Sequence, residues 1–469
     1  MMMNNSLYQG QNILLVSPPV YDYRLDWSKW HQPTGLLQLG RFLLQKHKDV
    51  RLIDCLHTER GKHLPRHKIG TQEIEGYTLQ KWHFGQPLER IKSRIKGLSA
   101  QEWTPDTVFV TCMNSVWWES ARDTIKLLKE LLPQAKIILG GTYPVVEPEH
   151  AVQYSGAHEV VTSNIPEVAR LAPDLSLYEE IPYSAGIYFY TCPGIHKPAD
   201  KLRPRSPNKI VKEIRDKAQL GVREFVFFDE EIQLRDRDAF GELLDEIATA
   251  DLDVHFVLAG NASPHVIDRS LARKLHRARV TQVYLRCDLQ PSLSENPYIT
   301  PLEEYERCTD ALVNAGGFKW REDGLAAMLV AGLPFEDLEA ISEKLVRLAH
   351  IVGSAILVPF QYVPSLHRGP RFDRALSQNG SFSPEKFNSK LFLLARLSGK
   401  SFEEYWELTR LAALLNSRYR SRTFDFLGQG LTAKMFRESI RTEGWNPFRE
   451  QVGVNPFLEV LPVSVTEGN

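Results

Sequence analysis

The chain has few of the features that mark secreted, disulfide-bonded or membrane proteins. Its 469 residues contain only five cysteines, Cys55, Cys112, Cys192, Cys287 and Cys308, and none belongs to a CxxC pair. An odd number of dispersed cysteines supports neither a disulfide framework nor a zinc site. No apolar run reaches the ~18 residues that a membrane helix needs, and the first residues lack the blocks of a signal peptide. We therefore expect a cytoplasmic protein without a membrane span.

The chain also lacks an excess of charge of either sign. It carries 57 basic and 58 acidic residues, so no field of the whole molecule favours nucleic acid or an anionic membrane. Basic clusters at 197–205 and 418–422 are of a size common on solvated surfaces. Apolar residues make up 43% of the chain, enough for large cores, and the length predicts roughly three domains. We expect a small-molecule substrate or a protein partner that the sequence does not identify, and no nucleic acid.

In the first third of the chain, short apolar runs alternate with segments of helical spacing. The expected strands are 12–16, 50–54, 107–111 and 136–139, and the expected helices include 35–44 and 121–132. Strands that alternate with helices predict a doubly wound parallel sheet, in which ligands bind beyond the carboxyl ends of the strands. The loops after Val16, Thr111 and Leu139 should therefore line one crevice.

From about residue 184, six further apolar runs recur with helices between them. They lie at 186–190, 224–228, 254–258, 282–285, 326–330 and 355–358. Repeated strand–helix units predict a parallel barrel or a second open sheet. Six units fit a (β/α)6 partial barrel better than the eight of a complete one, and function should lie at the carboxyl ends of these strands.

The alternation ends near Pro364, which indicates a helical C-terminal region. One helix is expected from Ser383 to Leu397 and another from Phe402 to Tyr419. One face of the second helix carries Phe402, Tyr405, Leu408, Leu411 and Leu415. The expected domains are therefore 1–170, 180–370 and 371–469.

The segment 190–199, YTCPGIHKPA, resembles the cluster loop of radical SAM enzymes with two ligands missing. That loop reads CxxxCxxC, and its three thiolates hold a 4Fe–4S cluster that binds S-adenosylmethionine (SAM). Here the three positions are Cys192, His196 and Ala199. Since cysteine is the usual cluster ligand, we do not expect a radical-generating cluster. Cys192 is the candidate metal ligand and His196 a second one, and the alternative for Cys192 is an inert buried thiol.

Other positions resemble the SAM-binding parts of the same family. The resemblance implies an acidic stretch after strand two, at Asp229, Glu230 and Glu231, and a SAM contact at Asp288. The run 332–336, GLPFE, resembles the Gly-Leu-Pro-Gly-Glu turn after strand five and implies a SAM-like site at Gly332. The acidic trio are candidate general acids or bases. The same three carboxylates can equally mark a helix start favoured by its dipole.

The first third resembles the cobalamin-binding domain that precedes many radical SAM cores. The resemblance rests on the segments 17–19, 33–36 and 140–144. It implies a cobalamin site whose candidate residues are Ser17, Ser115, Gly140, Gly141 and Thr142. A Gly-Gly turn lets a ligand approach the backbone without a Cβ clash.

A DxHxxG motif is absent, so we expect no cobalt ligand from that source. Trp117 and Trp118 are candidates to cover the lower face of the corrin, or they pack in a core.

Together the resemblances imply an α/β protein. It would have an N-terminal Rossmann-like cobalamin-binding domain, a (β/α)6 partial TIM barrel of radical SAM type and a helical C-terminal region. They point to cobalamin-dependent radical SAM methyltransferases and cyclases. We expect a cobalamin-binding, radical-SAM-like protein whose chemistry is polar methyl transfer rather than radical. Two alternatives stay open: a pseudoenzyme that acts as cobalamin sensor, carrier or partner subunit, and a radical SAM enzyme with unusual cluster ligation.

Overall fold

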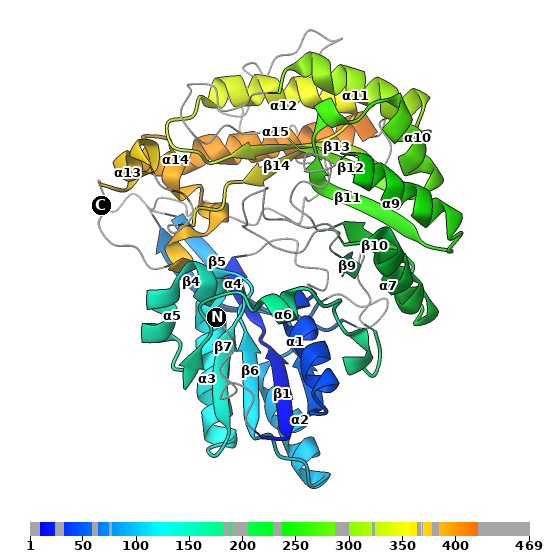
Figure 1. Ribbon diagram of the computed structural model, residues 1–469. Helices are drawn as coiled ribbons and strands as arrows, with labels where there is room; N and C mark the ends of the chain where they lie inside the picture. The colour runs from blue at the N-terminus through cyan, green and yellow to red at the C-terminus, as the bar shows by residue number, and fades with distance from the viewer. Residues whose placement is uncertain are drawn as a thin grey trace, which may run out of the picture.

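Two parallel sheets and a small antiparallel sheet make up the strand framework (Figure 1). The computed structural model describes residues 10–23, 32–58, 64–74, 77–181, 187–189, 205–227, 237–286, 300–320, 324–363, 367, 369–377 and 384–420. The expectation of a mixed α/β protein with parallel sheets and helices is confirmed.

The first sheet has five parallel strands in the order β3-β1-β6-β7-β8. They are β1 (Asn12–Ser17), β3 (Asp49–Asp54), β6 (Thr107–Thr111), β7 (Lys136–Gly140) and β8 (Glu159–Val160). The helices beside it are α1 (Thr34–Gln45), α2 (Leu88–Ala100), α3 (Trp118–Leu131), α4 (Thr142–Val146), α5 (Pro148–Tyr154) and α6 (Pro166–Ala169). The strands β1, β6 and β7 are buried on both faces and form continuous apolar runs, which explains why they were predicted correctly. The strand β3 was also predicted, although Arg51 within it is exposed.

The second sheet has six parallel strands in sequential order, from β9 at one edge to β14 at the other. They are β9 (Ile187–Phe189), β10 (Glu224–Phe227), β11 (His255–Ala262), β12 (Val280–Arg286), β13 (Leu325–Ala331) and β14 (Ala355–Pro359). Its helices are α7 (Pro207–Gln219), α9 (Arg237–Thr249), α10 (Arg269–Arg277), α11 (Leu302–Asn314) and α12 (Leu338–Val352). All six expected strands are confirmed. Within the described residues β9 does not pair with β14, so the sheet stays open.

Local sequence signals fix several of these helix ends. The Asp337 side chain accepts hydrogen bonds from the N–H groups of Glu339 and Ala340 at the start of α12, and Gly353 ends that helix at φ 96°. Such a side-chain cap followed by a left-handed glycine satisfies backbone groups that the helix itself leaves open. The Asp268 carboxylate starts α10 in the same way, by accepting from the N–H of Leu271 at 2.8 Å.

The small antiparallel sheet, in the order β2-β5-β4, was not predicted. It consists of β2 (Val20–Tyr23), β4 (Arg66–Ile74) and β5 (Tyr77–Phe84). Its strand β2 follows directly after β1, so the small sheet continues from the end of the first sheet. The strand β4 is exposed along most of its length and carries no apolar pattern, which explains why sequence reasoning missed it.

The C-terminal region is helical, but its first predicted helix is wrong. In place of one helix from Ser383 to Leu397, there are the 3-10 helices η6 (Pro384–Phe387) and η7 (Ser389–Leu391) and the short helix α14 (Leu393–Leu397). The left-handed backbone of Phe392, at φ 47°, prevents one continuous helix. The helix α15 (Phe402–Arg420) agrees with the prediction. All five residues of its predicted apolar face are buried. The remaining helix is α13 (Pro370–Leu376).

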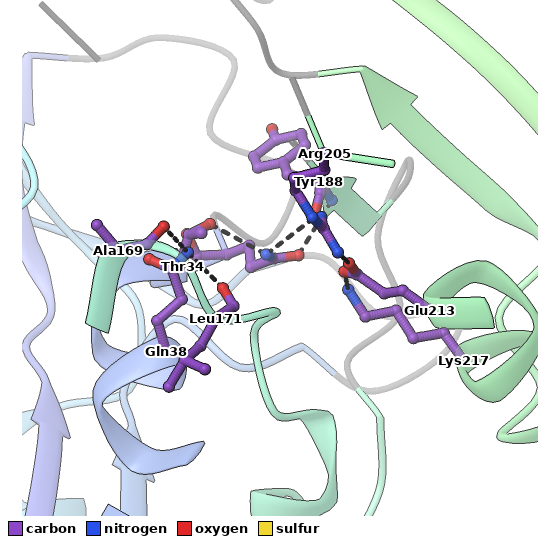
Figure 2. Close-up of polar contacts among 9 residues, drawn as sticks. Thr34, Gln38, Ala169, Leu171, Tyr188, Arg205, Glu213 and Lys217 are labelled. Carbon is purple, nitrogen blue, oxygen red and sulfur yellow. Dashed lines mark hydrogen bonds and ion pairs between the residues drawn. The ribbon is translucent and has the colours of Figure 1, made fainter. Parts of the chain in front are cut away.

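A side-chain amide joins the first sheet region to the second sheet. Gln32, before α1, accepts a hydrogen bond from the N–H of Tyr188 at 3.0 Å and donates one to its carbonyl at 3.2 Å. The Gln32 side chain therefore takes the place of a neighbouring strand beside β9. Gln38 of α1 donates to the carbonyl oxygens of Ala169 and Leu171, which holds α6 close by (Figure 2).

A buried ion cluster lies next to this contact. Glu213 of α7 pairs with Lys217 and Arg205 at 2.6 Å each, and its side chain is 6% exposed (Figure 2). Burial alone would raise the pKa of the Glu213 carboxyl, but the two cations bring it below its usual range. The cluster thus ties Arg205, which lies just before α7, to Glu213 within that helix.

Replacing Glu213 with Gln should lower the free energy of unfolding by about 3 kcal/mol, because the Lys217 ammonium stays buried without its counter-ion. Urea unfolding of the purified variant measures the change. The control is Glu159→Gln, which removes the partially exposed pair with Lys136 and should cost less than about 1 kcal/mol. Equal losses in the two variants would contradict the assigned role of the cluster.

Candidate functional site

A small pocket with room for about one water molecule lies at the carboxyl ends of β1 and β6. It is lined by residues 17–20, by residues 111–113 and by Trp117, Ser120 and Ala121. Of the three loops predicted to line one crevice, those after Val16 and Thr111 take part, whereas the loop after Leu139 contributes no lining residue. Ligands of open α/β sheets bind at this end of the strands.

Ser17, the last residue of β1, places an unsatisfied hydroxyl at this pocket. Its side chain is fully buried, and its Oγ has no hydrogen-bond partner among the described residues. Its carbonyl oxygen, by contrast, accepts from the N–H of Cys55 at 2.9 Å. Because a buried hydroxyl without a partner is costly, the Ser17 Oγ marks where a ligand atom or a water would gain a hydrogen bond.

The Gly140–Gly141 turn lies beside Cys112, which lines the pocket. The Cys112 N–H donates to the Gly140 carbonyl at 2.9 Å, and the Tyr143 N–H donates to the Cys112 carbonyl at 3.1 Å. Gly141 has φ 100°, and a Cβ there would lie 2.4 Å from the Cys112 carbonyl oxygen. A Cβ at Gly140 would meet nothing within 4 Å. The fold itself therefore requires glycine at Gly141, whereas Gly140 leaves open space in front of the backbone.

Of the five predicted cobalamin residues, only Ser17 lines the pocket, and Ser115 and Thr142, like the two glycines, do not. Ser115 begins the 3-10 helix η2 (Ser115–Trp117) and is 5% exposed, and Thr142 begins α4 and is exposed. Thr111 and Cys112 do line the pocket but were not predicted. The sequence could have identified them through their position at the carboxyl end of the predicted strand β6. Burial raises the pKa of the Cys112 thiol to about 12, so it stays protonated and is not a nucleophile.

Trp117 joins the pocket wall to the C-terminal region through Asp22. Its indole N–H donates to Asp22 Oδ2 at 2.9 Å, and the Asn388 amide donates to Asp22 Oδ1 at 2.7 Å. Lys390 forms an ion pair with the same carboxylate, which is 3% exposed. Trp118 instead packs edge-on against His150, at 4.9 Å between ring centroids. Of the two tryptophans considered for the corrin, only Trp117 therefore faces the pocket.

The predicted SAM-like turn after β13 is held closed by its own glutamate. The Glu336 carboxylate accepts from the N–H groups of Gly332 at 2.8 Å and Leu333 at 3.1 Å, and from the Tyr405 hydroxyl of α15. Burial raises the pKa of Glu336 to about 7, although these hydrogen bonds act in the opposite direction. A Cβ at Gly332 would lie 3.2 Å from the Phe392 ring. The turn thus packs against the C-terminal region.

Phe335 stands where the resembling turn has its second glycine, and it keeps the glycine conformation. Its φ is 59°, and its side chain is exposed beneath the Arg374 guanidinium, which lies 5.7 Å from the ring. A left-handed backbone is unfavourable for a bulky residue. The turn therefore holds a bulky residue in a backbone conformation that favours glycine.

The remaining predicted site residues lie outside the described residues. They are Cys192, His196, Asp229, Glu230, Glu231 and Asp288. In the part of the chain that is described, no three His, Cys, Asp or Glu side chains are placed to hold a metal ion. The same described part contains no helix with the length and apolar character to cross a membrane.

Comparisons with known proteins give no family for this chain. No protein-family model and no curated protein matches it. Among solved structures, a cobalamin-binding protein from Desulfitobacterium hafniense DCB-2 is 19% identical over 33% of this chain, with a TM-score of 0.19. The YdjI aldolase from Escherichia coli K12 is 11% identical, covers 69% of this chain and 96% of its own length, and has a TM-score of 0.21.

The carboxyl transferase domain of Rhizobium etli pyruvate carboxylase is 12% identical to this chain. The match covers 73% of this chain and 48% of the chain in that structure, with a TM-score of 0.22. The match to the cobalamin-binding protein spans 54% of that protein.

Replacing Asp22 with Ala should lower the free energy of unfolding by about 3 kcal/mol, because the buried Lys390 ammonium loses its counter-ion. Chemical denaturation measures the loss. The matched control is Asp49→Ala in the exposed pair with Arg51, which should cost less than about 1 kcal/mol. If Asp22→Ala were as stable as the control, the Asp22 contacts would not hold the C-terminal region in place.

Raising the pH should lower the free energy of unfolding through Glu336, whose carboxylate holds the turn at Gly332. Since the Glu336 pKa rises from 4.5 to about 7 in the folded protein, folding takes up protons between these values. The free energy of unfolding should therefore fall as the pH rises through this window. Glu336→Gln should show a smaller fall than wild type in urea unfolding from about pH 5 to about pH 8, whereas the exposed Glu339→Gln should behave as wild type. An unchanged pH dependence in Glu336→Gln would contradict this assignment.

Proposed function

We propose that the chain is a cobalamin-binding, radical-SAM-like protein without the usual three-cysteine cluster site. In this proposal residues 1–170 form a Rossmann-like cobalamin domain, residues 180–370 a partial barrel of radical SAM type and residues 371–469 a helical cap. The observation that carries the proposal is the buried, unpartnered Ser17 hydroxyl at a pocket in the predicted crevice. An unsatisfied polar group in a pocket indicates a ligand more specifically than the fold does.

The residues around the pocket fit one end of such a ligand. The Ser17 hydroxyl offers a hydrogen bond, and the open space in front of Gly140 lets a ligand approach the backbone. The enclosed space at Ser17 has room for about one water molecule. Only a terminal polar group of the ligand would therefore enter it, with the rest of the ligand outside.

Cobalamin, when bound, supplies a cobalt centre that can carry a methyl group between a donor and an acceptor. The residues of the chain would hold and orient the cofactor: Ser17 and Gly140 at the tail, with Ser115 and Thr142 at the rim. Trp117, fixed by Asp22, would exclude water from the pocket wall. The SAM-like site at Asp288 and Gly332 remains part of the proposal, with a polar rather than a radical use of SAM.

The alternative function is that of a pseudoenzyme that binds cobalamin as sensor, carrier or partner subunit. One observation favours it: the Gly332 turn is packed against Phe392, and Glu336 is engaged with its own backbone and with Tyr405. A SAM molecule at this turn would have to displace these contacts. The two functions share the cobalamin site and differ only in turnover.

Replacing Ser17 with Ala should have opposite effects on stability and on binding. The free energy of unfolding should rise by about 1 kcal/mol, because an unsatisfied buried hydroxyl is removed. The dissociation constant for hydroxocobalamin should increase by about threefold to tenfold, because a ligand hydrogen bond is lost. Thermal unfolding and absorbance titration measure the two effects.

The matched control is Ser120→Ala, because Ser120 also lines the pocket. The Ser120 hydroxyl already donates to the Trp117 carbonyl at 2.8 Å, so its loss should destabilise the protein and leave binding nearly unchanged. Gly140→Leu should keep the fold and abolish binding, because the added side chain fills the open space. Tight hydroxocobalamin binding by Gly140→Leu, or none by wild type, would contradict the proposed site.

A further inference from the structure

The strand β4 is an open edge of the small antiparallel sheet. Within the described residues it pairs only with β5, and its other side is free of strand partners (Figure 1). Residues 65–71 are all exposed, including Ile69 at 41%. An exposed edge strand presents a row of unpaired N–H and C=O groups, which can pair with another chain.

The pairing with β5 shows which backbone groups face outward. The Gly85 N–H donates to the Pro65 carbonyl at 2.7 Å, so Pro65 faces β5. In an antiparallel ladder, alternate residues direct their backbone groups to the same neighbour. Before the bulge, the groups that face away from β5 are therefore those of Arg66 and Lys68.

A bulge changes this alternation in the middle of β4. Lys68 lies opposite Trp82, but the next pair is Gly70 with Lys81, so Ile69 is the extra residue. Beyond the bulge the groups that face outward are consequently those of Thr71 and Glu73. The outward positions are thus even-numbered on one side of the bulge and odd-numbered on the other.

This arrangement is self-complementary in an antiparallel pairing. A two-fold axis between Ile69 and Gly70 places Arg66 opposite Glu73 of a second copy and Lys68 opposite Thr71 of that copy. All of these residues face outward, so the backbone hydrogen bonds of both copies can form. Moving the register by one residue would set outward groups against inward ones and break this ladder.

The side chains follow the same two-fold symmetry. Residues that lie directly opposite each other in a ladder have neighbouring side chains, so Arg66 of each copy would meet Glu73 of the other. Within one chain these two residues are not partners: Arg66 lies opposite Phe84 and Glu73 opposite Thr78. Near the axis, the exposed Ile69 would pack over Gly70, which has no side chain.

We propose that β4 is a self-association surface that pairs antiparallel with β4 of a second copy, with Arg66–Glu73 ion pairs at both ends. Lysine residues and bulges on edge strands usually oppose such pairing. Here the bulge lies at the symmetry axis, and Lys68 faces Thr71 rather than another cation. The contact is short, so the dimer should be weak and depend on concentration.

The test is sedimentation velocity from about 1 to about 500 μM, the range suited to a weak interface. Wild type should shift toward dimer as the concentration rises. Arg66→Glu should weaken dimerisation by at least about tenfold, because two like-charge contacts replace two ion pairs. Lys92→Glu, an equal charge change at an exposed position of α2, should dimerise as wild type.

A charge swap separates pairing from an effect on folding. The double variant Arg66→Glu, Glu73→Arg should regain dimerisation to within about threefold of wild type, because opposite charges again face each other. Thr71→Pro should abolish dimerisation, because it removes an outward-facing N–H while the ladder to β5 keeps its bonds. A protein that stays monomeric throughout, or a double variant that fails to recover, would overturn the proposal.

Discussion

The buried carboxylate of Asp22 is the interaction on which the arrangement around the pocket depends. It lies in β2, next to the end of β1, and it contacts the Trp117 indole, the Asn388 amide and the Lys390 ammonium. A carboxylate removed from water needs such partners, because its desolvation is otherwise uncompensated. Burial also lowers the pKa of Lys390, which Asp22 counteracts. One side chain therefore joins the small antiparallel sheet, the pocket residue Trp117 and the C-terminal region.

Buried polar groups hold the chain on either side of the segment that resembles a cluster loop. Tyr188, just before that segment, is bound by Gln32, and Arg205, just after it, is bound by Glu213. The side chains that hold both ends are buried. The described residues on both sides of this segment are therefore held by buried polar groups.

The sequence predicted the parallel sheets well and the small sheet not at all, for one physical reason. Strands covered on both faces need apolar residues throughout, as in 107–111, TVFVT. The exposed strand β4 has no buried face and leaves no such pattern. The expected helix from Ser383 to Leu397 failed because helical spacing does not reveal that Phe392 adopts a left-handed conformation.

The site was partly predictable from the same rule. Ser17 was named from the resemblance to cobalamin-binding domains and lines the pocket, whereas the Gly-Gly turn, named in the same way, does not. Thr111 and Cys112 could have been named because they lie at the end of a predicted strand. The sequence could not reveal that Gly141 is required by the Cys112 carbonyl, because this close approach joins the ends of two strands. Nor could it show that the Glu336 carboxylate turns back on its own loop.

The most direct test of the central claim is cobalt and iron analysis, with a visible spectrum, of protein purified without oxygen after supply of cobalamin, iron and sulfide. The account predicts about one cobalt per chain, a corrin spectrum and no stoichiometric iron. About four iron atoms per chain would contradict the absence of a cluster. A protein that takes up no cobalt would contradict the cobalamin site itself.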